Sequence, residues 1–348
     1  MQSEYLRVPK AELADLVAGI LAGSGLPPED AGVAADVLVR ADMRGIESHG
    51  VSRLRAYYLD ALRAGHINPR PVIRPTRRSG AVAVVDGDNG LGPVVAWRSM
   101  RLCLELAGES GLGLVLTRRS NHFGIAAYYA LMATAENMAG FTLTNSQPLT
   151  IPTHGRRRLV GTNPICVAVP ARRCRPFVLD MATSVVPIGR IQLHSRLGRD
   201  VPPGWGADGE GRPTTDPGCI LQEGGLFPLG GPAATAGYKG YGLAAAVDVL
   251  AGVLSGAAFL DGVLPPGHAD PSDVGHAFAA VRLDLLGDPD DLKDRMDRFI
   301  LRLKACPPGA GGEAVLVPGE KEYWEEEIAR AEGVRVRREV LAGLRAEG

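Results

Sequence analysis

Ten residues near the N-terminus, 44–53, contain an imidazole, two serine hydroxyls and two guanidinium groups. His49 can pass a proton to a carbonyl oxygen or an imine nitrogen, because an imidazole titrates near neutral pH. Arg44 or Arg53 can hold a carboxylate through two parallel hydrogen bonds. The alternative is that Ser48 caps a helix and both arginines are solvated, and the residue types alone do not separate the two interpretations.

A second histidine, His122, lies within residues 120–124, between a predicted strand and a predicted helix. At the start of a helix, free backbone N–H groups and the helix dipole favour a neutral imidazole and a bound anion. A neutral His122 is suited to donate to a carbonyl group or to lie beside a phosphate or carboxylate. The structural alternative is a helix cap formed by Ser120 or Asn121.

Small polar residues also stand at the ends of predicted strands, at 144–148 and 161–164. Such residues turn the chain and also bind ribose and phosphate oxygens, and turn chemistry is the favoured interpretation from the residues alone. Asp180 ends an apolar strand, where a carboxylate can accept hydrogen bonds from ribose hydroxyls or polarise a histidine. Alternatively, Asp180, Thr183 or Ser184 caps a following helix.

Lys239 is one of only five lysines in a chain with 38 basic residues, and glycines flank it at 237 and 240. Gly240, Gly242 and Ala245 match the dinucleotide fingerprint G-x-G-x-x-A. No predicted strand precedes this match, so the strand–turn–helix context that the fingerprint requires is missing. A Rossmann domain is not supported anywhere in the chain, although a lysine among glycines can still approach a pyrophosphate or carboxylate closely.

The apolar pattern predicts the elements that position these residues. Helical spacing covers 13–21, a second helix starts at Pro27, and a third covers 52–64. Further strands are predicted at 81–86, 113–117, 141–144, 165–169, 177–180 and 278–285, and further helices at 93–106, 123–136, 242–254, 291–303 and 323–331. This alternation predicts an α/β fold with part of its sheet buried on both faces. Residues 196–237 show no period and are expected to form a long ordered excursion or a lid.

The composition narrows the class of protein. The chain has 348 residues, 45% hydrophobic and 22% charged, which is typical of about two globular domains. A net charge of −1 argues against nucleic-acid binding through overall basicity. The sequence has no apolar run long enough for a membrane span and no signal-peptide core, so we expect a cytoplasmic protein. Its five cysteines, an odd number without a CxxC pair, indicate neither a disulfide framework nor a metal site.

Taken together, nine motifs resemble those of the type 2 malate/L-lactate dehydrogenases. Relatives in that family include sulfolactate and ureidoglycolate dehydrogenases, diketogulonate reductase and piperideine/pyrroline-2-carboxylate reductase. The motifs are R-G-I-E-S-H-G-V-S-R (44–53), S-N-H-F-G (120–124), T-N-S-Q-P (144–148), G-T-N-P (161–164), L-D-M-A-T-S (179–184), P-T-T-D-P (213–217), Y-K-G-Y-G-L (238–243), D-V-G-H (273–276) and P-G-E (318–320). Each motif is weak alone, but nine in order over nearly the whole chain are specific.

The resemblance implies a non-Rossmann mixed sheet flanked by helices, which binds NAD or NADP and typically forms a homodimer. It implies a discontinuous helical domain, residues 1–75 plus 265–348, for the substrate and dimerisation. Residues 76–264 then form the NAD(P)-binding mixed-sheet domain. No metal, nucleic acid or membrane is expected.

The resemblance also implies residue roles. His49 transfers the proton beside Ser48 and Arg53, and His122 lies in the same site as the second candidate. Substrate binding is expected from Arg44, Arg53 and Thr144. The expected cofactor-binding residues are Ser146, Asp180, Met181, Ala182, Lys239, Gly319 and Glu320.

The expected reaction is hydride transfer between NAD(P)H and C2 of a small 2-oxo or 2-hydroxy acid such as malate or lactate. The alternatives are a cyclic imino-acid reductase, a specialised biosynthetic ketone or imine reductase, or a ligand-binding protein without turnover. Arginines at 156–158 can meet a 2′-phosphate, although a solvated charge run is the favoured interpretation. Departures from the family pattern at Ala127, His154 and Arg190, and an insertion at 231–236, leave the substrate and the choice of NAD or NADP open.

Overall fold

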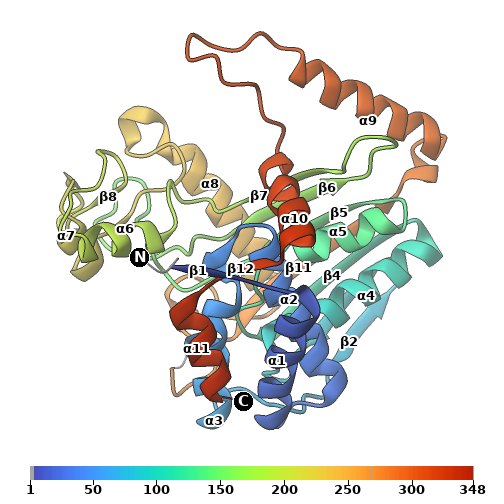
Figure 1. Cartoon of the computed structure of the whole chain (residues 1–348), viewed down its shortest axis with the longest axis horizontal. Coiled ribbons are helices and arrows are strands. Elements are labelled where there is room, and N and C mark those ends of the chain that lie inside the picture. Colours follow the sequence, from blue (N-terminus) through green and yellow to red (C-terminus); the bar gives the residue numbers. More distant parts are fainter. Residues whose placement is uncertain (1–3, 267, 348) are drawn as a thin grey trace.

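A seven-stranded mixed sheet forms the centre of the computed structural model, which describes residues 4–266 and 268–347 (Figure 1). Its strands, in spatial order, are β2 (Arg74–Ser79), β3 (Val82–Asp86), β4 (Leu112–Ser120), β11 (Val274–Arg282), β5 (Met138–Thr144), β6 (Ile165–Val169) and β7 (Phe177–Met181). Only β3 and β4 pair in parallel, and the other neighbours are antiparallel. The predicted mixed sheet flanked by helices is confirmed.

The central strand β11 is buried along most of its length because helices cover both of its faces. On one face lie α4 (Gly92–Ser110) and α5 (Ala126–Ala135), whose core includes Tyr129 and Phe278. The other face packs against α8 (Gly237–Asp248) and the π-helical turn η5 (Val249–Val253). There the backbones approach so closely that a Cβ on Gly275 would lie 1.8 Å from the Ala251 carbonyl oxygen.

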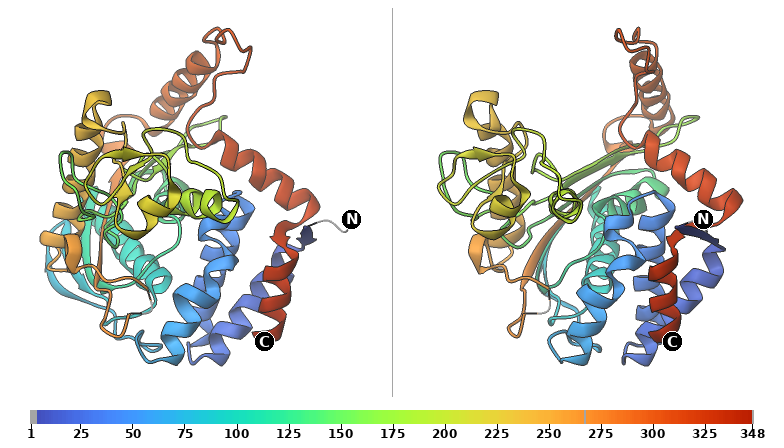
Figure 2. Two further views of the ribbon diagram at one scale, coloured as in Figure 1. Left: turned by 90° about the vertical axis from the view of Figure 1, so that its left-hand side faces the viewer. Right: turned by 60° about the vertical axis from the view of Figure 1, so that its left-hand side comes forward.

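Both ends of the chain build one helical layer beside the sheet (Figures 1 and 2). It contains α1 (Lys10–Gly23), α2 (Pro28–Met43), α10 (Glu320–Glu332) and α11 (Arg338–Glu347), and β1 (Tyr5–Val8) pairs in it with β12 (Val334–Arg337). Leu13, Val334 and Leu341 belong to the shared core, so the N-terminal helices pack with the C-terminal segment. Strand β11 lies in the sheet, although the family resemblance assigned residues 265–348 to the helical domain. The division into two domains stays a prediction.

The predicted helix over 52–64 is present but irregular. It consists of the 3-10 turn η2 (Val51–Arg53), the π-helical turn η3 (Leu54–Leu59) and α3 (Asp60–Arg63). Leu54, Tyr58 and Leu62 are buried, which explains the helical spacing in the sequence. Another 3-10 turn, η1 (Glu47–His49), precedes it, and Gly50 adopts an extended conformation between η1 and η2.

The excursion at 196–237 is ordered, as expected. It carries a small sheet of β8 (Gly206–Ala207), β9 (Pro213–Thr214) and β10 (Gly225–Leu226), which packs with α6 (Ile188–Arg196) and α7 (Pro217–Gln222). Its own small core includes Ile191, Ile220 and Leu226. Helix α9 (Pro289–Lys304), whose N-cap Asp288 accepts from the N–H groups of Asp290 and Asp291, projects from the body (Figure 2). Within the described residues, no helix is both long and apolar enough to cross a membrane.

Candidate active site

The two candidate histidines lie together although they come from different layers. His49 ends η1 in the helical layer, and His122 follows β4 of the sheet. Their rings stack with centroids 5.5 Å apart and an interplanar angle of 24°. Tyr57 contacts the His122 ring edge-on at 4.8 Å. The structure therefore brings the two proton-transfer candidates into one site.

The hydroxyl of Tyr58 holds one nitrogen of His122, with its Oη 2.7 Å from Nδ1. Burial raises the pKa of Tyr58 above its ordinary value, so the phenol stays protonated, and we assign it as the donor to Nδ1. Burial also lowers the pKa of His122 well below its ordinary value, and the neighbouring His49 and Arg53 lower it further. The neutral imidazole is as expected, but its cause is burial rather than a helix dipole, since α5 begins only at Ala126.

The expected helix caps around His122 are not found. Ser120 lies 2.8 Å, through its Oγ, from Nε2 of His276, and Asn121 donates through Nδ2 to the carbonyl oxygen of Gly90 at 2.9 Å. The N-terminus of α5 is instead met by Asp180, whose Oδ2 accepts from the N–H of Ala127 at 2.8 Å. Sequence neighbours of a helix start are the usual caps, whereas this carboxylate comes from a strand 53 residues away.

His49 is held by its own sequence neighbour, since the Oγ of Ser48 lies 2.9 Å from its Nδ1. Loss of solvent contact lowers the pKa of His49 to about 4, and the nearby Arg53 cation adds to the effect. Arg53 donates through Nε to the Ser48 carbonyl at 2.7 Å and lies over the Tyr57 ring at 5.0 Å. Within the described chain its two terminal nitrogens have no hydrogen-bond acceptor, so they are available to a carboxylate.

A buried carboxylate that sequence reasoning missed fixes the loop after His49. Asp42, at the end of α2, accepts through Oδ2 from the N–H of Val51 at 2.8 Å. A Cβ on Gly50 would lie 1.9 Å from Oδ1 of Asp42, so only glycine fits beneath the carboxylate. Burial raises the pKa of Asp42 to about 8, and the hydrogen bond from Val51 only partly opposes it. An acid on the buried face of α2 was the available signal in the sequence.

His276, which the sequence left as either core or site, lies behind His122 and is fully buried. Its Nδ1 is 2.8 Å from Oγ1 of Thr144, and its ring stacks on Phe123 at 4.7 Å. Oγ1 of Thr144 also lies 3.0 Å from two carbonyl oxygens, which can only accept. His276 therefore donates from Nδ1 to Thr144 and accepts at Nε2 from Ser120. The hydroxyl of Thr144, expected at the substrate, is directed into this buried network.

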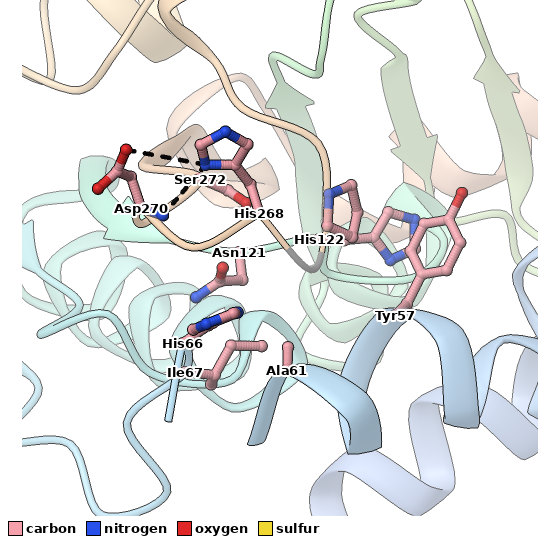
Figure 3. A pocket seen from close by; sticks show the side chains of 10 residues that line it. Tyr57, Ala61, His66, Ile67, Asn121, His122, His268, Asp270 and Ser272 are labelled. Atoms are coloured by element: carbon pink, nitrogen blue, oxygen red, sulfur yellow. Dashed lines mark hydrogen bonds and ion pairs between the residues drawn. The ribbon is translucent and has the colours of Figure 1, made fainter. Parts of the chain in front are cut away.

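A small cavity of about 10 Å³, the histidine pocket, opens beside His122 (Figure 3). Its lining residues are Tyr57, Ala61, His66, Ile67, Asn121, His122, Pro266, His268, Asp270 and Ser272. In Figure 3, Asn121 lies between His66 and the pair His268–Asp270, and Tyr57 and His122 lie at one side. The volume suits about one water molecule. His66 and His268 are thus additional site neighbours that no sequence motif identified.

A larger pocket of about 350 Å³, the arginine pocket, lies between the helical layer and the edge strand β7. It is lined by Arg44, Ile46, Ala127, Val178, Leu179, Asp180, Leu316, Val317, Pro318, Gly319, Lys321 and Glu322. Its walls reduce the solvation of Asp180 and raise the pKa of that carboxyl to about 6, although water still reaches it. Arg44 lies here with two expected cofactor residues, Asp180 and Gly319, and neither candidate histidine lines this pocket.

The remaining expected cofactor residues lie around the ends of β5, β7 and α8. Oγ of Ser146 accepts from the Thr162 N–H at 3.0 Å, and Asn163 donates to the Ala244 carbonyl in α8 at 2.9 Å. These bonds join the two polar turns to the helix that carries Lys239. Lys239 is exposed in the first turn of α8 and forms no ion pair within the described chain. No strand leads into α8, which agrees with rejecting the fingerprint.

The other expected cofactor residues lie at the end of β7 and at the start of α10. Met181 ends β7 and Ala182 follows it. Gly319 has a φ of 90° in the turn before α10, and Glu320 pairs there with Lys304 at 2.6 Å. The insertion at 231–236 forms the short turn η4 (Ala233–Thr235) directly before α8. In the described part of the chain, no group of three histidine, cysteine, aspartate or glutamate residues is placed to hold a metal ion.

The site as a whole is suited to bind a small anion and to transfer a proton to or from it. Two neutral imidazoles each have one nitrogen held by a hydroxyl and the other open, and Arg53 offers free donors beside them. The second pocket supplies a separate cavity of the size used for small-molecule binding.

Comparison with known proteins gives the site a family. A family profile described as malate/L-lactate dehydrogenase matches residues 8–345, and the chain belongs to this family. Malate dehydrogenase from Pyrococcus horikoshii is 42% identical over 99% of this chain and 95% of its own length. L-sulfolactate dehydrogenase from Methanocaldococcus jannaschii is 39% identical over 92% of this chain and 90% of its own.

Solved structures agree with the sequence relationship. The structure of malate dehydrogenase from Pyrococcus horikoshii matches with a TM-score of 0.92 at 39% identity and covers 99% of this chain and 95% of its own. Sulfolactate dehydrogenase from Methanocaldococcus jannaschii matches with a TM-score of 0.90 at 35% identity, covering 98% of this chain and 96% of its own. The resemblance inferred from the motifs is confirmed, and the protein is an oxidoreductase of this family.

Proposed function

We propose that the protein transfers a hydride between a nicotinamide cofactor and C2 of a small 2-oxo or 2-hydroxy acid such as malate or lactate. The observation that carries the proposal is the stacked pair of neutral imidazoles beside the free donors of Arg53. Relatives named malate and sulfolactate dehydrogenase support this substrate class. When bound, the cofactor supplies or accepts the hydride at C4 of the nicotinamide.

The protein supplies orientation and a proton. Arg53 holds the substrate carboxylate through its terminal nitrogens, which directs the C2 oxygen towards the imidazoles. In the oxidative direction, Nε2 of His49 accepts the hydroxyl proton, and the lowered pKa keeps this acceptor form populated at neutral pH. In the reductive direction the same nitrogen returns a proton to the oxygen. His122, fixed by Tyr58, is the second candidate for this step.

The arginine pocket fits part of a nicotinamide dinucleotide. Its volume of about 350 Å³ is near the low end for small-molecule sites, and Arg44, one of the residues that line it, has two buried nitrogens without a partner within the described residues. Gly319 lets the backbone approach closely, since a Cβ there would lie 3.0 Å from the Cβ of Val178. The proposed cofactor residues are Ser146, Asp180, Met181, Ala182, Lys239, Gly319 and Glu320.

The structure gives the arginines at 156–158 other partners. Arg156 and Arg157 are exposed and face Glu210 and Asp261 at 3.8 Å. Arg158 donates to carbonyl oxygens of the excursion, including that of Gly224 at 2.6 Å. None of the three lines either pocket. These contacts favour a structural or solvated role over a 2′-phosphate site, so NAD and NADP both stay in the proposal.

We also propose that the enzyme works in the cytoplasm as a homodimer. The sequence composition supports the location, and the family resemblance supports the dimer. Helix α10 presents Trp324 and Ile328 to solvent, 46% and 39% exposed, on the layer expected to dimerise. Light scattering on the purified protein gives the mass, and a monomer at micromolar concentration would contradict the assembly.

A cyclic imino-acid reductase is the second candidate. The delta(1)-pyrroline-2-carboxylate/delta(1)-piperideine-2-carboxylate reductase of Pseudomonas putida is 30% identical over 99% of this chain and 97% of its own. The same imidazoles can protonate an imine nitrogen. A panel of malate, lactate, sulfolactate and both cyclic imino acids, each with NAD(H) and NADP(H), separates the candidates. Cofactor binding without turnover of any of them would favour a binding protein.

Alanine substitutions assign the proton-transfer residue. His49→Ala is expected to lower kcat by at least about 100-fold while thermal unfolding shows a folded protein. A folded variant with unchanged kcat would refute the role of His49. For His122→Ala, a near-normal kcat with a raised cofactor KM would place His122 in binding rather than in proton transfer.

A further inference from the structure

Arg44 presents buried hydrogen-bond donors that nothing in the described chain uses. Only 2% of the residue is exposed, and its Nη1 pairs with Oε2 of Glu326 at 3.1 Å. Its Nε and Nη2 are buried without an acceptor, and the hydroxyl of Tyr323, which interacts with the Arg44 guanidinium, is buried as well. A buried donor without a partner costs about 1–3 kcal/mol, so such groups usually serve a ligand or ordered water.

The position of Arg44 separates it from the substrate site. It lines the arginine pocket with Asp180 and Gly319, whereas Arg53 lies against Tyr57 and the two histidines. The guanidinium is fixed from two sides, because Tyr323 stacks on it at 4.8 Å while Glu326 holds Nη1. A guanidinium immobilised in this way loses little entropy when its remaining N–H groups bind a ligand.

The charges around Arg44 are mixed. Glu326 is shared by three arginines, since Arg40 and Arg330 reach it at 3.0 and 2.6 Å in addition to Arg44. Arg44 is the member of this cluster that lines the pocket, where Lys321 adds a second cation and Asp180 and Glu322 add two carboxylates. The lining therefore suits a ligand that has oxygen acceptors for Arg44 and hydroxyl donors for the carboxylates, rather than one selected by net charge.

We infer that Arg44 binds the nucleotide cofactor rather than the substrate carboxylate, donating through Nε and Nη2 to oxygen acceptors on the part of the dinucleotide held in the arginine pocket. This inference rests on the proposed function. It assigns the two arginines of the segment 44–53 to different ligands, Arg44 to the cofactor and Arg53 to the 2-oxo acid. The sequence had left them interchangeable.

The test compares Arg44→Met with Arg40→Met by calorimetric titration of NADH and, separately, NADPH. Arg44→Met is expected to raise the Kd of the bound nucleotide at least about tenfold, because hydrogen bonds from a charged donor are lost. Arg40→Met removes the same charge from Glu326 but lies outside the pocket lining, so its Kd should stay within about twofold. Glu326 keeps two arginine partners in either variant, which favours folding, and thermal unfolding checks it.

Kinetics supply the second readout. At saturating cofactor, Arg44→Met should keep the KM for the 2-oxo acid, whereas Arg53→Met should raise that KM and leave the nucleotide Kd unchanged. A larger loss for NADPH than NADH identifies a 2′-phosphate as the acceptor, and equal losses identify an acceptor common to both.

Three results would overturn the assignment. One is an unchanged nucleotide Kd in Arg44→Met, another is an equal loss in Arg40→Met, and the third is an effect on the KM for the 2-oxo acid alone. If Arg44→Met does not fold, Arg44→Lys, which retains the charge but not the two donors, must show the rise in Kd. A wild-type protein that binds neither nucleotide would refute the proposed function itself.

Discussion

At the scale of single residues, the position of His49 depends on how closely Gly50 and Asp42 fit together. The backbone at Gly50 is extended, so glycine is required there for space rather than for φ. Gly50→Ala is expected to push the Asp42 carboxylate aside, lose the Val51 hydrogen bond and destabilise the fold by about 1–3 kcal/mol. We expect kcat to fall at least about tenfold because His49 precedes this turn.

The matched control for this substitution is Gly32→Ala. Gly32 lies within α2, and a Cβ there meets nothing within 4 Å. An added methyl group in a helix interior should raise stability by about 0.5–1 kcal/mol and leave kcat unchanged. If Gly50→Ala retains wild-type kcat and stability, Asp42 does not position the histidine.

The lowered pKa of His49, about 4, predicts the pH dependence of the oxidative reaction. The free enzyme needs a neutral imidazole as proton acceptor, and this form persists until the pH approaches about 4. We therefore expect kcat/KM for hydroxy-acid oxidation to show no step from His49 near pH 6.5, because this histidine loses its acceptor form only below about pH 5. A limb centred near 6.5 in wild type that disappears in a folded His49 variant would show an unshifted histidine instead.

Sequence motifs identified the histidines but not the residues that fix them. His49 and His122 stand in recognisable clusters, and the structure brings them within 5.5 Å. Asp42, Tyr58 and His276 act through contacts between layers, and no local spacing in one sequence specifies such contacts. The sequence also could not separate Arg44 from Arg53, because two arginines nine residues apart look alike until tertiary packing places Arg44 in the arginine pocket and Arg53 beside Tyr57.

At the scale of elements, sequence patterns located those with a strong apolar period. The predicted strand 165–169 and the helix 93–106 correspond to β6 and α4. Strands β1 and β12 were missed because each has only four residues, and they pair with one another from opposite ends of the chain. Their pairing is a tertiary contact, and a four-residue alternation is too short to predict a strand from propensity alone.

At His154 the chain departs from the family pattern, and the effect of this residue on stability can be measured. His154 adopts a φ of 65° in an exposed turn. The left-handed conformation is strained for a residue with a Cβ, so His154→Gly should stabilise the protein by about 0.5–1 kcal/mol after the greater unfolded-state entropy of glycine is counted. Thermal unfolding checks this, with a Tm rise of roughly 1–3 °C expected.

The control lies in the same turn. Arg157 is exposed and has no positive φ, so Arg157→Gly should lower rather than raise Tm. A loss of stability in His154→Gly comparable with that control would mean that the imidazole stabilises the turn by more than the strain costs.

At the scale of the whole molecule, the site depends on both ends of the chain. The segment with His49 follows α2, which packs in the shared core of the helical layer with β12 and α10. His122 and His276 belong to the sheet. The stacked histidines therefore form only when the two layers pack, and the burial that results from this packing shifts their pKa values.

The groups with shifted pKa values also predict how stability responds to pH. His49, His122 and His276 have pKa values below the ordinary 6.5 in the folded protein, so the unfolded chain binds more protons below that pH. Their contribution to the free energy of unfolding therefore falls on acidification from about pH 6.5. Asp42 and Asp180 have pKa values of about 8 and about 6 in the folded protein, above the ordinary 3.8 of an aspartate. The contribution of Asp42 to stability therefore rises on acidification from pH 8 to 3.8, and that of Asp180 rises from pH 6 to 3.8. Asp180 is exposed, so its contribution is small, whereas burial also raises the pKa values of Asp248 and Asp273, which act in the same direction as Asp42. We expect the three histidines to outweigh these carboxyls and the wild-type Tm to fall between pH 6.5 and 5.

Asp42→Asn removes one opposing group while an amide oxygen still accepts from Val51, so its Tm should fall more steeply over this range and exceed that of wild type most at pH 8. A wild-type Tm that rises on acidification below 6.5, or parallel curves for the two proteins, would contradict this assignment of the buried groups.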